Sequence, residues 1–122
     1  MNLLKGLRIL IVEDELMIAL DLEGTLIDAG AEIIGPAHTV SRALELVDTP
    51  GLTAAIVDLR LHNEPARPII ERLAARGVPF VIYSGQGDSA AATWPEAPLI
   101  SKPAPQELIV KTLAAIATRQ PG

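Results

Sequence analysis

The sequence contains no cysteine, and only two of its 122 residues are histidine. The chain therefore has no disulfides, iron–sulfur clusters, zinc–thiolate sites or cysteine nucleophile, and two histidines argue against a multi-histidine metal centre. No apolar run approaches the ~20 residues that span a bilayer. The net charge of −5 argues against non-specific affinity for nucleic acid. From these absences we expect a cytoplasmic protein with neither a membrane nor a nucleic-acid partner.

The length and composition are those of one domain that spans residues 1–122. With 49% hydrophobic residues, a chain of this size can bury a core without a disulfide or a structural metal. The ten prolines and nine glycines are scattered, and many stand where elements should change. We expect the core of the domain to cover about residues 6–119. Only three residues follow Arg119, so no output domain is expected within the chain.

Short apolar runs alternate with helical patterns along the chain. The runs predict strands over Arg8–Val12, Glu32–Ile34, Leu52–Asp58, Val78–Tyr83 and Leu99–Ile100. The patterns predict helices over Glu15–Ala29, Arg42–Val47 with Thr39 as its cap, Pro65–Arg76 and Pro105–Arg119, and a short or irregular helix within 86–98. Gly30 should end the first helix, and Gly35-Pro36 should stop the second strand. This alternation predicts an α/β, flavodoxin-like (βα)5 fold, doubly wound around a five-stranded parallel sheet of order 2-1-3-4-5.

Polar residues stand at the carboxyl ends of four predicted strands. They are Glu13 and Asp14, then Asp58, then Ser84 and Gly85, and finally Lys102. The predicted fold brings these ends to one edge of the sheet, where ligands of such folds bind. Three close carboxylates repel one another, and a bound Mg²⁺ removes that conflict. With an ammonium, a hydroxyl and a backbone amide nearby, the set predicts a phosphoryl-transfer site with the Asp58 carboxylate as nucleophile.

Four motifs resemble the response-regulator receiver domain, the family of the bacterial chemotaxis regulator. They are Ile-Leu-Ile-Val-Glu-Asp-Glu from Ile9, Ala-Ile-Val-Asp-Leu from Ala55, Tyr-Ser-Gly from Tyr83 and Ser-Lys-Pro from Ser101. Each motif alone is weak, but all four in this order and spacing are specific. The resemblance implies a protein of bacterial two-component signalling, in which Asp58 accepts a phosphoryl group from a histidine kinase or a histidine phosphotransfer protein and thereby changes the affinity for a downstream protein partner.

The resemblance also implies a role for each matching position. Mg²⁺, with Mn²⁺ as an alternative, would be held by Glu13, Asp14, Asp58 and the backbone carbonyl of Arg60. The phosphoryl oxygens would contact Ser84, Lys102 and the backbone amides of Leu59 and Gly85. From their positions two residues past Asp58 and Ser84, we also expect Arg60 and Gln86 to lie near the hydrolytic water and to influence the lifetime of the acyl phosphate. The family usually has a cis peptide between the residues that match Lys102 and Pro103.

The sequence departs from the usual receiver pattern at two places. Leu99 stands where many receivers carry the Tyr or Phe that couples to the hydroxyl after the fourth strand, so that coupling cannot take its usual form. The segment after that strand is short of helix signals. Together with Glu64-Pro65 and the segment Arg76-Gly-Val-Pro-Phe80, these features resemble a group of stand-alone receivers from alphaproteobacteria.

Three other functions compete with that of a messenger. The chain could be a phosphate sink that drains a shared kinase, or a pseudo-receiver that binds its partner constitutively. A Mg²⁺-dependent phosphatase with an aspartyl-phosphate intermediate is the most remote, because such enzymes usually space their acids differently after the first strand and need a cap for the substrate. We expect no enzyme activity beyond the chain's own phosphorylation and dephosphorylation.

A few further residues admit two interpretations. His38 and His62 are expected in surface loops rather than in a catalytic site, although His62 lies four residues past Asp58. Trp94 is expected to be partly buried, with a partner-binding anchor as the alternative. Leu20 and Ile27 lie off the main apolar stripe of the first helix, so they either pack under a loop or form a face that docks the helices of a kinase.

Overall fold

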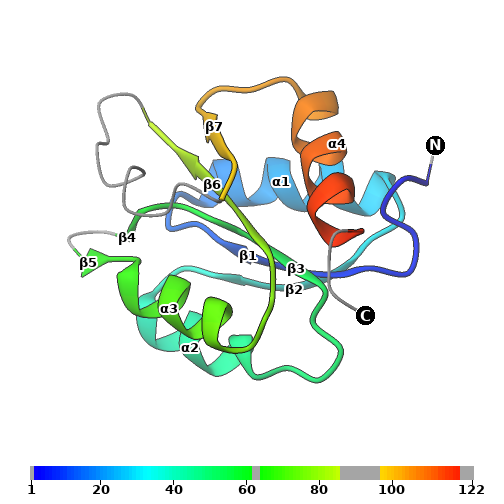
Figure 1. Cartoon of the computed structure of the whole chain (residues 1–122). Helices are drawn as coiled ribbons and strands as arrows, with labels where there is room; N and C mark the ends of the chain where they lie inside the picture. The colour runs from blue at the N-terminus through cyan, green and yellow to red at the C-terminus, as the bar shows by residue number, and fades with distance from the viewer. Residues whose placement is uncertain (1, 62–63, 86–96, 119–122) are drawn as a thin grey trace.

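Five parallel strands form a central sheet with helices on both of its faces (Figure 1). The computed structural model describes residues 2–61, 64–85 and 97–118. Its elements are β1 (Arg8–Val12), α1 (Leu16–Asp28), β2 (Glu32–Ala37), α2 (Val40–Val47), β3 (Ala54–Val57), β4 (Arg60–Leu61), β5 (Glu64–Pro65), α3 (Arg67–Ala75), β6 (Phe80–Ser84), β7 (Leu99–Ser101) and α4 (Gln106–Ala117). The predicted α/β doubly wound fold is confirmed.

The strands of the central sheet follow the order β2-β1-β3-β6-β7. Counted along the chain without the small strands β4 and β5, this is the expected order 2-1-3-4-5. The pair β4 and β5 forms a separate antiparallel hairpin that the sequence did not indicate. Because Pro65 belongs to β5, α3 begins at Arg67 and not at Pro65. The helix expected within 86–98 falls mostly on residues 86–96, which lie outside the described residues.

Alternate side chains of β1 enter two different cores. Leu10 and Val12 face one core, which is closed by α2 and α3, whereas Ile9 and Ile11 face the other, which is closed by α1 and α4. All four side chains are at most 1% exposed. A strand buried on both faces reads as a continuous apolar run, which is why Arg8–Val12 was recognisable in the sequence. The two cores cover both faces of the sheet and leave its carboxyl edge as the place where polar groups can gather.

The second strand runs past its predicted stop. It was expected to end before Gly35-Pro36, but β2 continues to Ala37. The prediction was wrong because β2 is an edge strand, where a proline without an N–H costs no inter-strand hydrogen bond. The pairing shifts its register between Leu10 and Val12, and Gly35 takes a φ of +94° there.

The predicted ends of the first two helices are confirmed. Gly30 directly follows Ala29, the C-cap residue of α1. Its φ of +100° is a conformation that glycine adopts without strain. The Thr39 hydroxyl accepts a hydrogen bond of 3.1 Å from the backbone N–H of Arg42 and so caps α2. Residue 38 lies just before this cap, in the short turn between β2 and α2.

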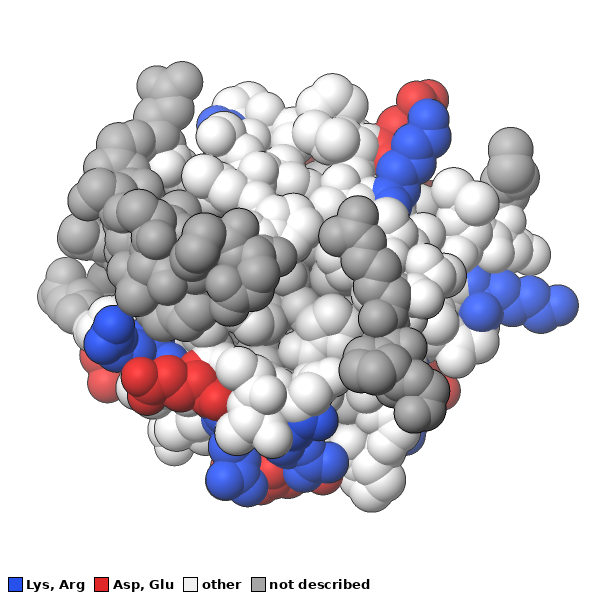
Figure 2. Space-filling view, viewed as in Figure 1, with Lys and Arg blue, Asp and Glu red and all other residues white. Residues whose placement is uncertain are grey.

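An exposed ion-pair cluster joins α2 to α3. The Asp48 carboxylate lies 2.8 Å from the Arg72 guanidinium and 3.0 Å from that of Arg76. These two arginines hold the pKa of Asp48 below its ordinary value. Figure 2 shows charged side chains gathered over α2 and α3. None of the helices in the described ranges is long and apolar enough to cross a membrane.

Candidate functional site

Backbone hydrogen bonds between neighbouring strands continue one residue past the ends of β3 and β7. The N–H of Asp58 donates to the carbonyl of Val12 at 3.0 Å, and the N–H of Lys102 donates to the carbonyl of Ser84 at 2.9 Å. The positions of Asp58 and Lys102 are therefore fixed by the sheet rather than by loops. The residues that follow β1, β3, β6 and β7 thus meet at a single edge, as the sequence predicted.

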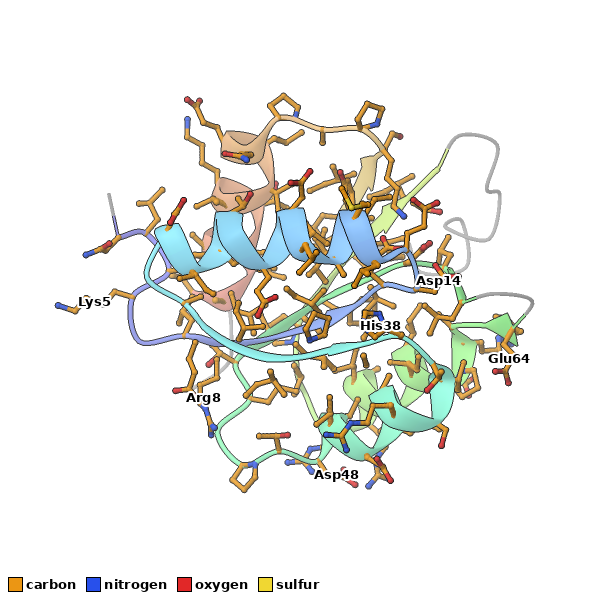
Figure 3. The ribbon with its side chains drawn as sticks, turned by 180° about the vertical axis from the view of Figure 1, so that it is seen from behind. Lys5, Arg8, Asp14, His38, Asp48 and Glu64 are labelled. Atoms are coloured by element: carbon orange, nitrogen blue, oxygen red, sulfur yellow. The ribbon has the colours of Figure 1, made fainter. Side chains whose placement is uncertain are left out.

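Three carboxylates come together at this edge. Oxygen atoms of Glu13, Asp14 and Asp58 all lie within 4.8 Å of one another, and these are the residues that the sequence indicated. Glu13 is 1% exposed and Asp58 is 8% exposed, whereas Asp14 is partly open to solvent. Asp14 and the start of α1 are at the same end of the sheet in Figure 3, far from Lys5.

A single ammonium group bridges two of these carboxylates. Lys102 Nζ lies 2.6 Å from Oε1 of Glu13 and 3.1 Å from Oδ2 of Asp58. The second oxygen of Glu13, Oε2, accepts a 3.1 Å hydrogen bond from the backbone N–H of Glu15. The buried Glu13 carboxylate thus has a donor at each oxygen, as a buried polar group requires.

The cluster has three carboxylates and one ammonium, and the pKa values of Glu13 and Lys102 reflect this excess of acidic groups. Burial raises the pKa of Glu13 from 4.5 to about 7, and the charge of Asp58 adds to this effect, although Lys102 and the Glu15 amide oppose it. Burial by itself would lower the pKa of Lys102, but its bonds to Glu13 and Asp58 outweigh burial, and the pKa of Lys102 is raised. The lysine therefore stays protonated, and the cluster keeps an excess of negative charge.

The donor set fits a bound Mg²⁺. All three groups offer carboxylate oxygens, which Mg²⁺ prefers, and oxygens around one such ion lie about 3–4 Å apart because each is about 2.1 Å from it. The carboxylate oxygens, which lie within 4.8 Å of one another, would need only small side-chain movements to surround one ion. The open side at Asp14 leaves room for water or for a phosphate oxygen. Glu13, Asp14 and Asp58 would hold the ion, which would offset the excess negative charge.

The other predicted site residues are placed as follows. Ser84 ends β6 and is 1% exposed, Leu59 is buried directly after Asp58, and Gly85 is exposed. The backbone of Arg60 begins β4, two residues after Asp58. The side chain of Arg60, and the whole of Gln86, His62 and Trp94, lie outside the described part of the chain. Leu99 begins β7, where it is 50% exposed, so its side chain lies at the surface.

Two residues contact the site although the sequence analysis assigned them no role there. The Tyr83 ring lies beneath Lys102, whose Nζ is 5.5 Å from the ring centroid, a distance at which a cation attracts an aromatic face. His38 lies in a loop, as expected, between β2 and α2, where it is half-buried and its Nδ1 lies 2.9 Å from the backbone oxygen of Glu13. The sequence analysis did not predict this contact, because it ended the second strand at Ile34, three residues before β2 ends. The Lys102–Pro103 peptide is cis, as the resemblance implied.

Comparisons with known proteins identify the class to which this fold and site belong. No protein-family model matches the chain, and neither does any curated protein sequence. A CheY-like response regulator receiver domain from Methanospirillum hungatei has a TM-score of 0.83 at 21% identity and covers 96% of each chain. The response regulator PhyR from Brucella abortus has a TM-score of 0.78 at 22% identity, and the match spans 95% of this chain and 50% of PhyR. The fold is therefore that of a receiver domain.

A third solved structure establishes a nearer relationship. SdrG from Sphingomonas melonis is 38% identical to the chain, with a TM-score of 0.75 and coverage of 95% of this chain and 98% of SdrG. With this identity over nearly the whole of both chains, and with the receiver fold that its other neighbours share, the chain belongs to the response-regulator receiver family. The family places the chain in two-component signalling in general terms.

Proposed function

We propose that the chain is a phosphorylation-controlled switch whose Asp58 accepts a phosphoryl group in a Mg²⁺-dependent reaction. The observation that carries the proposal is the bridge from Lys102 to Glu13 and Asp58 within a cluster of three carboxylates. A carboxylate held beside an ammonium and a divalent-cation site is the arrangement that stabilises the charge of a transferring phosphoryl group.

The reaction is a transfer between two nucleophiles. An oxygen of the Asp58 carboxylate attacks phosphorus, the bond from phosphorus to the imidazole nitrogen of the donor phosphohistidine breaks, and the electron pair stays with that nitrogen. The product is an acyl phosphate on Asp58. Lys102 orients the Asp58 carboxylate through Oδ2 and places positive charge where the phosphoryl oxygens arrive. Mg²⁺ would contribute a second positive charge on the side of Glu13 and Asp14. Water then attacks the acyl phosphate, the Asp58 carboxylate leaves with its electron pair, inorganic phosphate is released, and the switch is reset.

The surface beside the site supports a helical protein as the phosphoryl donor. The side chains of Leu16, Met17, Leu20 and Ile27 on α1 are between 52% and 75% exposed. At 100° per residue these four positions share one face of the helix, and α1 begins two residues after Asp14. An amphipathic helix of a histidine kinase or phosphotransfer protein would cover this apolar stripe and bring its phosphohistidine to the site. Leu20 and Ile27 do not pack under a loop, since each is 52% exposed.

The direct test is to measure whether Asp58 is phosphorylated. The purified native chain and an Asp58→Asn variant would be incubated with acetyl phosphate or phosphoramidate, each with Mg²⁺ and with a chelator, and their intact masses read. We expect the native chain with Mg²⁺ to gain the mass of one phosphoryl group, and the variant or the chelated sample to gain none. A native chain that binds Mg²⁺ and yet accepts no phosphoryl group from either small donor or from any phosphorylated kinase would contradict the proposal.

A further inference from the structure

The His38 ring lies against the backbone of the acidic cluster. Its Nδ1 is 2.9 Å from the carbonyl oxygen of Glu13, and the side chain is half-buried. A carbonyl oxygen only accepts hydrogen bonds, so the ring nitrogen that faces it carries a proton. His38 and Asp14 lie at the same end of the sheet in Figure 3, which places the ring beside the Glu13–Asp14 peptide.

The bond from His38 extends the pairing of β1 with β2 beyond the strands. Regular pairing ends at Val12 with Ala37. The N–H of Glu13 then donates to the carbonyl of Ala37 at 3.0 Å, and the carbonyl of Glu13 accepts from the His38 side chain. Two consecutive residues at the end of β2 thus hold both backbone polar groups of Glu13, with an imidazole donor in the place of a backbone N–H.

The held carbonyl belongs to the peptide unit that joins Glu13 to Asp14. Its orientation sets the direction in which the chain leaves β1, and so it sets where the Asp14 side chain begins. The Glu13 carboxylate has its own partners in Lys102 and the Glu15 amide. Asp14 is the more exposed acid of the cluster, so the fixed peptide matters most for Asp14.

We propose that His38 is a positioning residue for the divalent-cation site: its Nδ1–H fixes the Glu13–Asp14 peptide and thereby the direction of the Asp14 side chain. The inference rests on the proposed function, because it takes the cation site from there. A residue that holds a metal ligand in place lowers the cost of organising the site and so tightens metal binding without touching the ion.

The test compares three substitutions at residue 38 in the full chain. His38→Asn keeps an amide donor near the position of Nδ1, His38→Gln moves the donor further from the backbone, and His38→Ala removes it. We expect the Kd for Mg²⁺ alone, measured by titration calorimetry, to weaken about three- to tenfold in His38→Ala and His38→Gln. His38→Asn should bind within about twofold of the native chain, since it restores one hydrogen bond of the same kind.

A matched control separates positioning from general stability. Thr39→Ala removes the cap of the neighbouring helix, so it should lower the melting temperature and leave the Kd for Mg²⁺ unchanged. An NMR spectrum of the native ring nitrogens gives a readout that needs no metal: Nδ1 should carry a proton that is protected from exchange. A ring with its proton on Nε2 would overturn the inference.

The metal titration distinguishes failure of this inference from failure of the proposed function. Native Mg²⁺ binding with equally tight binding by His38→Ala would overturn the role of His38 alone. Equal weakening in His38→Asn and His38→Ala would also overturn it, because the hydrogen bond would then not be the cause. Absence of Mg²⁺ binding by the native chain would overturn the cation site itself, and the role of His38 with it.

Discussion

Lys102 donates to Glu13 across only 2.6 Å, and the same ammonium reaches Asp58 at 3.1 Å. The two carboxylates follow different strands, so this one side chain ties the ends of β1 and β3 to the loop after β7. Glu13 is 1% exposed and has no access to bulk water that could replace the lysine. The stability of the site and its chemistry therefore depend on the same contact.

Removal of the lysine charge should destabilise the chain, and Mg²⁺ should reverse the effect. In Lys102→Met two acids keep their burial and lose their cation, which we expect to cost about 2–3 kcal/mol of unfolding free energy at about pH 8. Added Mg²⁺ would restore much of that loss by supplying positive charge to the same oxygens. Urea unfolding of both chains, with Mg²⁺ and with a chelator, measures both effects.

The control for this prediction is Lys111→Met. Lys111 is an exposed lysine of α4, so the substitution removes the same charge without leaving a buried acid unpaired. Its unfolding free energy should stay within about 0.5 kcal/mol of the native value. Equal stability of Lys102→Met and Lys111→Met would show that the bridge does not hold the acids.

The raised pKa of Glu13 predicts a dependence of stability on pH. In the unfolded chain this carboxyl loses its proton near its ordinary pKa of 4.5, whereas in the folded chain it keeps the proton up to about pH 7. Between these values the folded state binds more protons, so its stability falls as pH rises through that window and levels off above it. At 1.4 kcal/mol per pKa unit the loss is about 3 kcal/mol at most.

Glu13→Gln isolates this contribution. The difference in unfolding free energy between the native chain and the variant, measured without Mg²⁺, should change between about pH 4.5 and 7 and be constant elsewhere. Protons should also compete with Mg²⁺, so the native Kd should weaken about tenfold per pH unit below pH 7. A Kd that is constant from about pH 5.5 to 8 would contradict this reading of the site.

The residues that sequence reasoning identified are those whose type is out of place in their local pattern. An acid after the apolar run Ala55–Val57, or a lysine after Leu99–Ile100, has no packing reason and points to chemistry. Tyr83 gave no such signal, because an aromatic residue inside a buried strand looks like ordinary core. The hairpin of β4 and β5 was invisible for a different reason, since strands of two residues carry no periodicity.

The error at β2 shows how one misplaced boundary hides a site residue. Gly and Pro usually end a strand, and reading Gly35-Pro36 in that way hid the contact between the loop residue His38 and the end of the first strand. The position of β2 at the sheet edge decides the outcome, and edge position is a property of the whole topology rather than of the local sequence.

Gly35→Ala should destabilise the strand that carries this end of the site. A Cβ at Gly35 would lie 2.8 Å from the backbone nitrogen of Ala37 and 3.2 Å from the carbonyl oxygen of Ile11, and the φ of +94° adds strain. We expect a loss of about 2 kcal/mol of unfolding free energy and weaker Mg²⁺ binding, because the carbonyl of Ala37 holds the Glu13 N–H.

The matched variant is Gly24→Ala, in the middle of α1. A Cβ there would meet nothing within 4 Å. The substitution should therefore stabilise the chain by about 0.5–1 kcal/mol through the higher helix propensity of alanine, with Mg²⁺ affinity unchanged. The two variants make the same chemical change. Changes of opposite sign in their unfolding free energies, measured with urea, would therefore identify the local backbone as the cause. A stabilised Gly35→Ala would mean that β2 does not take this path.

The apolar stripe on α1 makes a prediction that separates docking from chemistry. Leu20 is 52% exposed and contributes little to the core, so Leu20→Asp should leave the melting temperature within a few degrees of the native value. It should leave phosphorylation by acetyl phosphate unchanged, because a small donor needs no docking surface. The transfer rate from a phosphorylated kinase should fall about 10-fold or more, since a charge would enter an apolar contact.

Leu108→Asp, at the similarly exposed Leu108 on α4, is the control and should accept the phosphoryl group at the native rate. If the kinase reaction slows equally in both variants, the donor does not recognise α1, and a fall in the acetyl phosphate reaction would show that Leu20 acts on the site itself.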